Sequence, residues 1–269
     1  MQLFRDSASG MGSLPQISLP VTEDFEIPIP PIDIQEKIVE ILDNFTELTA
    51  RKKQYEYYRD KLLTFDDNEV EWKKLGDVGE IIRGNGLQKK DFISEGFPAI
   101  HYGQIYTKYG LSADKTFIYI SEDLASKLRI AKNKDLLIAT TSENDEDVLK
   151  PLAWFGGKVA ISGDMMLFRH SLNVKYIAYY FTTTNFQRQK QKYITGTKVR
   201  RVSKDNIEKI KIPIPSLEEQ ERIVSILDKF DTLTSSITEG LPREIELRQK
   251  QYEYYRDMLL NFPKEKEDK

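Results

Sequence analysis

The apolar positions near both ends of the chain have the spacing of an amphipathic helix. In the N-terminal set, alternating steps of three and four residues link Ile34, Ile38, Ile41, Phe45 and Leu48, and the stripe continues at Tyr55, Tyr58 and Leu62. A second set comprises Ile223, Ile226, Phe230, Leu233 and Ile237, followed by Tyr252, Tyr255 and Leu259. Such stripes are typical of helices that bury one face, and this spacing matches the seam of a coiled coil.

The two helical regions are copies of each other. IPIPPIDIQEKIVEILDNFTELT (27–49) returns as IPIPSLEEQERIVSILDKFDTLT (212–234), and RKKQYEYYRDKLLTF (51–65) returns as RQKQYEYYRDMLLNF (248–262). Between its two pieces the second copy carries twelve residues, SSITEGLPREIE, that the first copy lacks. The repeat predicts a helical module, a large single-copy segment and a second helical module.

Proline, glycine and capping residues indicate where the helices begin and end. The alternating prolines of I-P-I-P predict an extended segment at a sheet edge or domain border. Ser216 with Glu219, and Asp33 with Glu36, have the spacing of helix N-caps. The first helix is expected to run from about Asp33 to Phe65, roughly 50 Å, whereas a break near 240–242 interrupts the second. These helices are interpreted as rigid spacers, although a purely structural packing role remains open.

The segment between the modules has a different pattern. Short β-branched and aromatic runs, including FPAIHYGQIYT, KTFIYI, DLLIATTS and GKVAIS, alternate with turn residues, and VKYIAYYFTTTNFQRQKQKY predicts a helix with a basic tail. The predicted fold class is α+β, with one mixed α/β globular domain flanked by long amphipathic helices that form an antiparallel coiled coil or helix bundle. The expected boundaries are 1–26, 27–65 (helical), 66–211 (globular) and 212–269 (helical).

Composition and missing motifs exclude several kinds of chemistry. The 269 residues include no cysteine and only two histidines, so thiolate metal sites and cysteine nucleophiles are excluded. No long apolar run or signal peptide is found, and we expect a cytoplasmic protein without a membrane segment. Neither a P-loop nor the Pro-Pro-aromatic motif of DNA amino-methyltransferases occurs, and the acidic stretch SENDEDV lacks the pattern of a calcium loop. No catalytic residue, metal site or cofactor site is therefore predicted in this chain.

Basic residues concentrate locally although the net charge is −3. Nine basic and two acidic residues lie between Arg188 and Lys211. Cations around a Gly-Thr turn can hold DNA phosphates, which nominates Gly196, Thr197, Lys198, Arg200, Arg201 and Lys204. Two weaker groups comprise Arg83, Lys89 and Lys90, and Gln104 and Lys108 in HYGQIYTKYG. A solvated basic face is the alternative interpretation for each group.

These segments together resemble a type I restriction-modification DNA specificity subunit over nearly the whole chain. The resemblance is carried by IPIPSLEEQERIVSILDKF, RQKQYEYYRD, EWKKLGDVGEIIRGNG, HYGQIYTKYG, LLIATTSENDEDVLK and GTKVRRVSKDNIEKIKIPIPSLEEQ. It implies that residues 66–211 are a target recognition domain and that the helices are spacers. Residues 1–26 resemble the end of a preceding recognition domain, which would make the chain a half-subunit or truncated form.

The resemblance also implies partners and a task. A non-catalytic targeting subunit would direct methyltransferase and motor endonuclease subunits to a split site in double-stranded DNA. S-adenosylmethionine, ATP and Mg would then be bound by those partners, and this chain would act as a homodimer or pair with another specificity chain. TELTA (46–50) resembles a minimal form of the family's spacing repeat. A truncated, non-functional subunit, a coiled-coil protein-interaction module and a self-contained DNA enzyme remain as alternatives.

Overall fold

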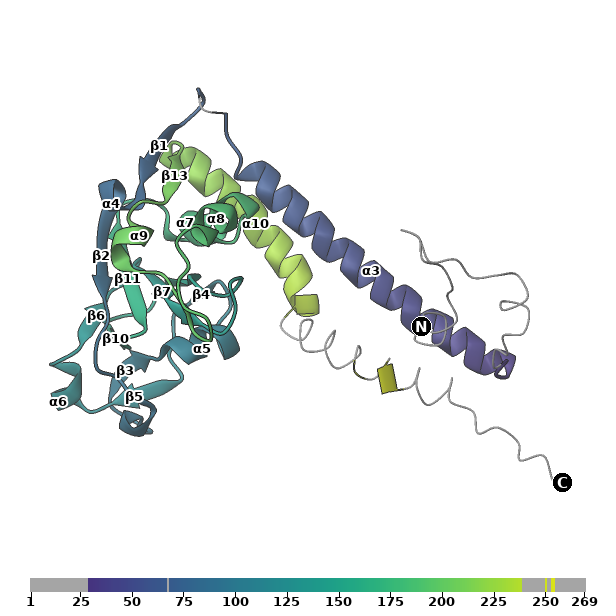
Figure 1. Cartoon of the computed structure of the whole chain (residues 1–269), viewed down its shortest axis with the longest axis horizontal. Coiled ribbons are helices and arrows are strands. Elements are labelled where there is room, and N and C mark those ends of the chain that lie inside the picture. The colour runs from purple at the N-terminus through teal and green to yellow at the C-terminus, as the bar shows by residue number, and fades with distance from the viewer. Residues whose placement is uncertain (1–28, 67, 239–249, 251–252, 255–269) are drawn as a thin grey trace, which may run out of the picture. The chain divides into compact units, whose positions relative to one another are not determined.

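The computed structural model describes residues 29–66, 68–238, 250 and 253–254 (Figure 1). The chain divides into two compact units, residues 1–49 with 240–269, and residues 50–239. Helix α3 (Ile32–Leu62) runs through the division between them, and α10 (Leu217–Thr238) lies in the second unit. The sheets and shorter helices described below all belong to the second unit.

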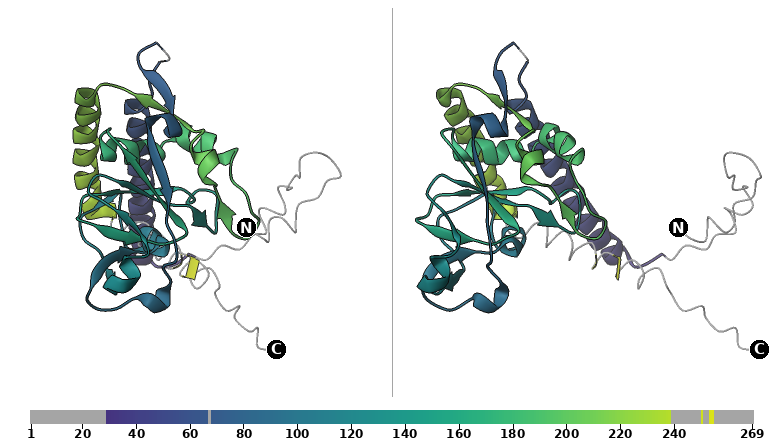
Figure 2. Two further views of the ribbon diagram at one scale, coloured as in Figure 1. Left: turned by 90° about the vertical axis from the view of Figure 1, so that its left-hand side faces the viewer. Right: turned by 60° about the vertical axis from the view of Figure 1, so that its left-hand side comes forward.

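Two mixed sheets form the body of this unit (Figures 1 and 2). The larger has the strand order β2 (Gly79–Arg83), β11 (Met165–His170), β7 (Leu136–Ala139), β9 (Lys150–Trp154) and β4 (Ser112–Ala113). The smaller has the order β5 (Ile118–Ile120), β3 (Phe97–Ile100), β10 (Val159–Ile161) and β6 (Arg129–Ala131). Most neighbours are antiparallel, but β4 with β9 and β3 with β10 are parallel.

Two short ribbons and several short helices complete the unit. The ribbons pair β1 (Glu71–Lys74) with β13 (Lys211–Ile214), and β8 (Thr141–Ser142) with β12 (Arg200–Arg201). The helices are α4 (Leu75–Val78), η1 (Lys89–Asp91), α5 (Tyr102–Thr107), α6 (Glu122–Ala125), α7 (Val174–Phe181), α8 (Thr184–Gln191) and α9 (Lys204–Ile207). The mixed α/β class predicted from the sequence is confirmed.

Alternating side chains of β7 connect two separate cores. Leu136 and Ile138 enter the cluster that includes α7, whereas Leu137 and Ala139 enter the cluster between the two sheets. This follows from the period of two in a strand, and it explains why β7 is buried on both faces.

Helix α10 packs as part of this unit. Ile223 and Leu227 are fully buried in the cluster that contains α7. On the same helix, the Asp228 carboxylate accepts a hydrogen bond of 2.8 Å from the Tyr179 hydroxyl. It also forms an ion pair with the Lys175 ammonium at 2.8 Å. Because of such contacts, the compact unit extends from Ala50 to Glu239, beyond the expected boundaries at 66 and 211.

Local signals predicted some helix ends and missed others. Ser216 caps α10 as expected, with its hydroxyl accepting from the Glu219 amide at 3.2 Å. Asp33 was predicted as an N-cap but lies inside α3, which begins at Ile32 after the prolines. The single helix predicted from VKYIAYYFTTTNFQRQKQKY is two helices, because the Thr183 side chain caps a new helix. The run FPAIHYGQIYT is a strand followed by helix α5.

Within the second unit, one residue of each predicted apolar stripe is in contact with the other. The rings of Tyr58 and Phe230 stack with centroids 6.0 Å apart, and burial raises the pKa of Tyr55 to about 12. Leu62 and Ile226 of this unit are half-buried, as is Ile38 in the first unit. Other predicted features lie outside the described residues: residues 1–26, the expected break at 240–242, Tyr252, Tyr255 and Leu259. The structure likewise does not describe four side chains within the helices, those of Ile41, Phe45 and Leu48 in α3 and of Leu233 in α10.

Candidate nucleic-acid interface

Residues 195–201 form a tight, exposed hairpin. The backbones of Thr195 and Arg201 exchange two hydrogen bonds of 2.9 Å. Gly196 has φ +94°, and a Cβ there would lie 2.1 Å from the Val199 carbonyl oxygen, so the turn requires glycine. Thr197, Lys198 and Val199 between these residues are all exposed. The hairpin therefore presents a cation and a hydroxyl at its tip, as the sequence predicted for this segment.

Arg200 lies at the base of this hairpin and is tied to the protein itself. Its guanidinium Nε lies 2.8 Å from Asp145 Oδ1, and its Nη1 donates to the carbonyl oxygen of Gly196. Arg200 also pairs with Ser142 in the β12–β8 ribbon. Asp145 belongs to the stretch interpreted from sequence as a solvated acidic loop, yet it is partly buried against Arg200. Arg201 is exposed beside it.

A second cationic group surrounds the start of α5. Arg83, Lys89 and Lys90 are exposed, and Arg83 Nε donates to the Gly163 carbonyl at 3.4 Å. Burial and the nearby Lys89 ammonium both lower the pKa of His101, while Asp164 acts in the opposite direction. Arg83 and Lys89 are thus brought to the same part of the surface, around His101 and the 163–164 turn.

Strand β8 connects the second group to the hairpin. The Thr141 hydroxyl donates to Asp164 Oδ1 at 3.0 Å, and the Thr141 carbonyl accepts from the Tyr106 hydroxyl at 3.0 Å. Thr141 pairs in turn with Arg201 across the β8–β12 ribbon. The hairpin, β8, the 163–164 turn and the start of α5 therefore form one connected region.

Three other predicted residues have local partners. Lys204 lies in α9, with its ammonium 3.6 Å from a Glu208 carboxylate oxygen. Gln104 uses its side-chain carbonyl to accept from the His101 amide at 3.0 Å, which caps α5. The Lys108 ammonium lies 5.8 Å from the centroid of the exposed Phe117 ring. Among the predicted cations of the described region, five have neither a hydrogen bond nor an ion pair through the side chain: Lys89, Lys90, Lys108, Lys198 and Arg201.

Sequence reasoning did not identify the residues that connect this region. These residues are Tyr106, Thr141 and Asp164. They lie in separate segments of the chain, and no sequence motif relates their positions. Lys190 was counted as one cation of a basic run but is 1% exposed. Across the described residues, no three His, Cys, Asp or Glu side chains are grouped so that they could hold a metal ion. No helix in that part of the chain has the length and apolarity needed to cross a membrane.

Comparison with protein families gives one match to most of the chain. Residues 5–56 and 68–247 match the family described as "Type I restriction modification DNA specificity domain".

Two relatives are described as specificity subunits of type I systems. The specificity subunit of the type I restriction enzyme EcoR124I/EcoR124II from Escherichia coli is 41% identical over 260 residues, covering 89% of this chain and 64% of the relative. The putative type I specificity subunit S.MpnORF201P from Mycoplasma pneumoniae is 32% identical over 258 residues, covering 88% of this chain and 97% of the relative. The chain thus spans less than two thirds of the first relative but nearly all of the second.

Solved structures show a related fold. The HsdS subunit from Thermoanaerobacter tengcongensis superimposes with a TM-score of 0.51 at 18% identity, covering 96% of this chain and 66% of the other. A chain from a structure concerning assembly and conformational transition of the type I R-M system gives a TM-score of 0.55 at 17% identity, covering 96% and 67%.

Proposed function

The chain belongs to the type I restriction-modification DNA specificity family, and from this membership we propose that it is a sequence-specific DNA-targeting subunit. In this role the compact unit from Ala50 to Glu239 binds one part of a split site in double-stranded DNA. It carries no reaction itself and brings the site to partner subunits.

The observation that best supports this proposal is the connected region described above. The exposed hairpin tip with Lys198 is joined through β8 to the cationic group with Arg83 and Lys89. Cations contact DNA phosphates without regard to sequence, whereas hydroxyls and amides in the same region can bond to base edges. An exposed hairpin with a cation at its tip, connected to a second cationic group, suits both kinds of contact.

The partners and cofactors in this proposal follow from the family. A methyltransferase subunit supplies S-adenosylmethionine chemistry, and a restriction subunit supplies ATP- and Mg-dependent cleavage. The helices α3 and α10 serve as spacers in a coiled coil or helix bundle, and the chain acts as a homodimer or pairs with another specificity chain. In this proposal the subunit binds chromosomal and incoming DNA in the cytoplasm.

Methylation mapping tests the proposal directly. The chain is co-expressed with its cognate methyltransferase subunit in a host without DNA methylation, and modified adenines are mapped by long-read sequencing. A split motif that depends on this chain is the expected result. A palindromic motif indicates a symmetric pair, and an asymmetric motif indicates pairing with a different specificity chain. If both proteins are soluble and associated but no adenine is modified, the targeting proposal is wrong.

A further inference from the structure

Lys190, at the C-terminal end of α8, is a buried lysine with an unusual set of partners. Its side chain is 1% exposed, and its ammonium donates to the backbone carbonyls of Glu146 at 2.8 Å and Val148 at 2.9 Å. A buried cation is costly unless its donors are satisfied by hydrogen bonds. Burial accordingly lowers the pKa of Lys190 to about 8. An apolar side chain at this position would avoid this cost.

The carbonyls that Lys190 binds belong to a loop with a strained backbone. Leu149 is 1% exposed and has φ +65°, a conformation that a branched side chain seldom adopts. Its amide donates to the Ala139 carbonyl at 2.9 Å. Earlier in the loop, the Asn144 side chain accepts from the Asp147 amide at 2.7 Å. Such a conformation persists only when the surroundings hold it, and Lys190 provides two of the holding contacts.

The same loop reaches the candidate DNA-binding hairpin through one ion pair. Asp145 lies next to Glu146 in sequence, and its carboxylate lies 2.8 Å from Arg200 Nε. Arg200 in turn donates to the Gly196 carbonyl inside the hairpin. Contacts therefore run from the Lys190 ammonium through the loop and Arg200 to the turn that presents Lys198.

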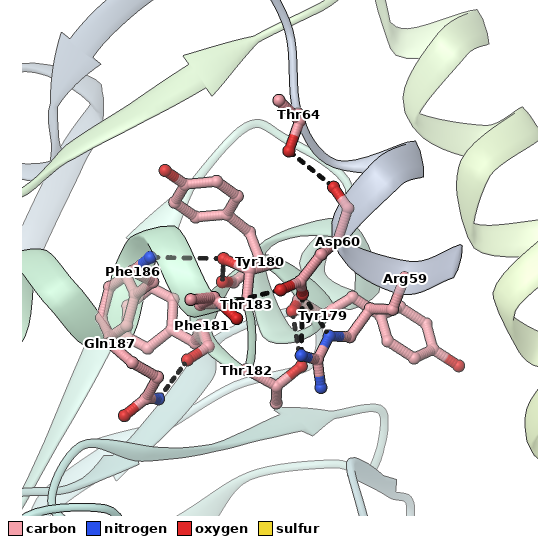
Figure 3. A network of polar contacts seen from close by, with 11 residues as sticks. Arg59, Asp60, Thr64, Tyr179, Tyr180, Phe181, Thr182, Thr183, Phe186 and Gln187 are labelled. Atoms are coloured by element: carbon pink, nitrogen blue, oxygen red, sulfur yellow. Dashed lines mark hydrogen bonds and ion pairs between the residues drawn. The ribbon is translucent and has the colours of Figure 1, made fainter. Parts of the chain in front are cut away.

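The other end of α8 is also fixed. Thr184, the first residue of α8, donates its amide to the Asp60 carboxylate at 3.2 Å. Arg59 donates to the same carboxylate (Figure 3). Because α8 is held at its N-terminus by Asp60, Lys190 extends from a rigid support and can set the position of the loop.

From these contacts we infer that Lys190 is a positioning residue for DNA binding, acting through Asp145 and Arg200 on the hairpin 195–201. Arg200 then has a scaffold role, and the hairpin contacts DNA through its exposed tip. The inference rests on the proposed function of the same region.

The first test compares variants of the full chain bound to its methyltransferase subunit. Fluorescence anisotropy is measured with a labelled duplex that carries the mapped methylation motif. Lys190→Met is expected to weaken DNA binding about tenfold, because the buried carbonyl acceptors lose their donor. Lys158→Met removes the same charge from an exposed position before β10 and should change affinity less than about twofold. Equal effects of the two variants would overturn the inference. A wild-type complex that binds no duplex would instead overturn the proposed function.

A double-mutant cycle separates positioning from general loss of structure. In an Arg200→Gln background the path to the hairpin is already interrupted, so Lys190→Met should add less than about a twofold loss. A full tenfold loss in both backgrounds would show that Lys190 acts by another route, and the inference would fail.

Chemical restoration of the amine provides a second readout. The chain has no cysteine, so Lys190→Cys introduces a single thiol. Alkylation of the denatured variant with bromoethylamine, followed by refolding, restores an ammonium at lysine length, whereas iodoacetamide gives a neutral side chain of similar bulk. Recovery of affinity with the amine alone supports the inference. Equal affinity after both treatments contradicts it.

Discussion

The carboxylate of Asp60 accepts a hydrogen bond from the backbone amide of Thr184, 124 positions later in the chain, at 3.2 Å. Arg59 holds the other oxygen of that carboxylate through two guanidinium hydrogen bonds of 2.9 and 2.7 Å. An anion at the first residue of α8 is favourable because free amides and the helix dipole point toward it. The last turn of α3 is thereby held against the start of α8 (Figure 3).

Replacing Asp60 by alanine should therefore destabilise the domain. The Thr184 amide loses its carboxylate acceptor, although the Thr183 cap remains, and Arg59 is left without its carboxylate partner, so we expect a decrease of about 1–2 kcal/mol in the free energy of unfolding. Urea denaturation followed by circular dichroism measures this change. Asp114→Ala, at an exposed position, serves as the control and should stay within about 0.5 kcal/mol of wild type. Equal stability of the two variants would show that the contact between Asp60 and the start of α8 does not stabilise the fold.

Protonation of His170 should make the stability of the protein depend on pH. Burial is the main cause that lowers the pKa of His170 to about 4, from an ordinary value of 6.5. Between these pH values the unfolded chain binds a proton that the folded chain does not, so stability should fall as the pH is lowered from 6.5 toward 4. The loss is on the order of 2–3 kcal/mol at the lower limit, and above pH 6.5 this group contributes no slope.

His170→Asn isolates this contribution. In the wild type, His170 Nδ1 accepts a hydrogen bond of 3.1 Å from the Leu172 amide. The side-chain carbonyl of asparagine can accept the same bond, but asparagine does not titrate. Urea unfolding at a series of pH values should give a flatter dependence for the variant than for wild type between pH 4 and 6.5. Parallel curves would mean that other groups, such as paired carboxylates, cause the acid sensitivity.

The sequence predicted elements where one local signal was sufficient. Ser216 and Glu219 marked the start of α10, and the alternating prolines marked β13, whose one partner among the described strands is β1. The break between α7 and α8 was missed because the apolar pattern continues past it to Phe186, while the Thr183 side chain, bonded to the Phe186 amide, restarts the helix. Local composition does not distinguish a threonine that caps from one inside a helix.

The candidate site was predicted only in part, because tertiary contacts decide which cations are free. Lys190 and Lys198 belong to one basic run in the sequence, but the first is buried and the second is exposed. The acceptors of Lys190 lie 44 and 42 positions earlier in the chain, in a loop that sequence alone does not place beside α8. The charge pattern therefore predicted the cations of the hairpin but not the buried contacts of Lys190 that lie behind it.

The turn of the hairpin gives a test that separates DNA binding from folding. At Gly196 a Cβ would lie 2.1 Å from the Val199 carbonyl oxygen, so Gly196→Ala must rearrange the exposed tip. We expect at least about a tenfold loss of DNA affinity with a stability change below about 1 kcal/mol, because the tip contributes little to the core. Gly110→Ala is the matched control, since its Cβ would meet nothing within 4 Å. Unchanged affinity in Gly196→Ala would remove the hairpin from the interface.

The exposed cations of the hairpin should determine part of the salt dependence of binding. Each phosphate contact contributes about 0.9 to the slope of log affinity against log salt concentration. Lys198→Ala and Arg201→Ala are each expected to lower that slope by about one contact, whereas Lys158→Ala should leave it unchanged. The slope is obtained by titrating the labelled duplex at several salt concentrations. A wild-type slope in both hairpin variants would show that these cations face solvent in the complex.

The length of α3 should set the distance between the two parts of the DNA site. Four helical residues inserted after Ala50 lengthen a helix by about 6 Å, or about two base pairs. The mapped methylation motif should then gain unread positions in its centre while its outer bases stay the same. The same four residues inserted after Asn68, beyond the end of α3, provide the control and should leave the motif unchanged. If neither insertion alters the motif, or if both alter it equally, α3 does not act as a spacer, even if the chain still targets DNA.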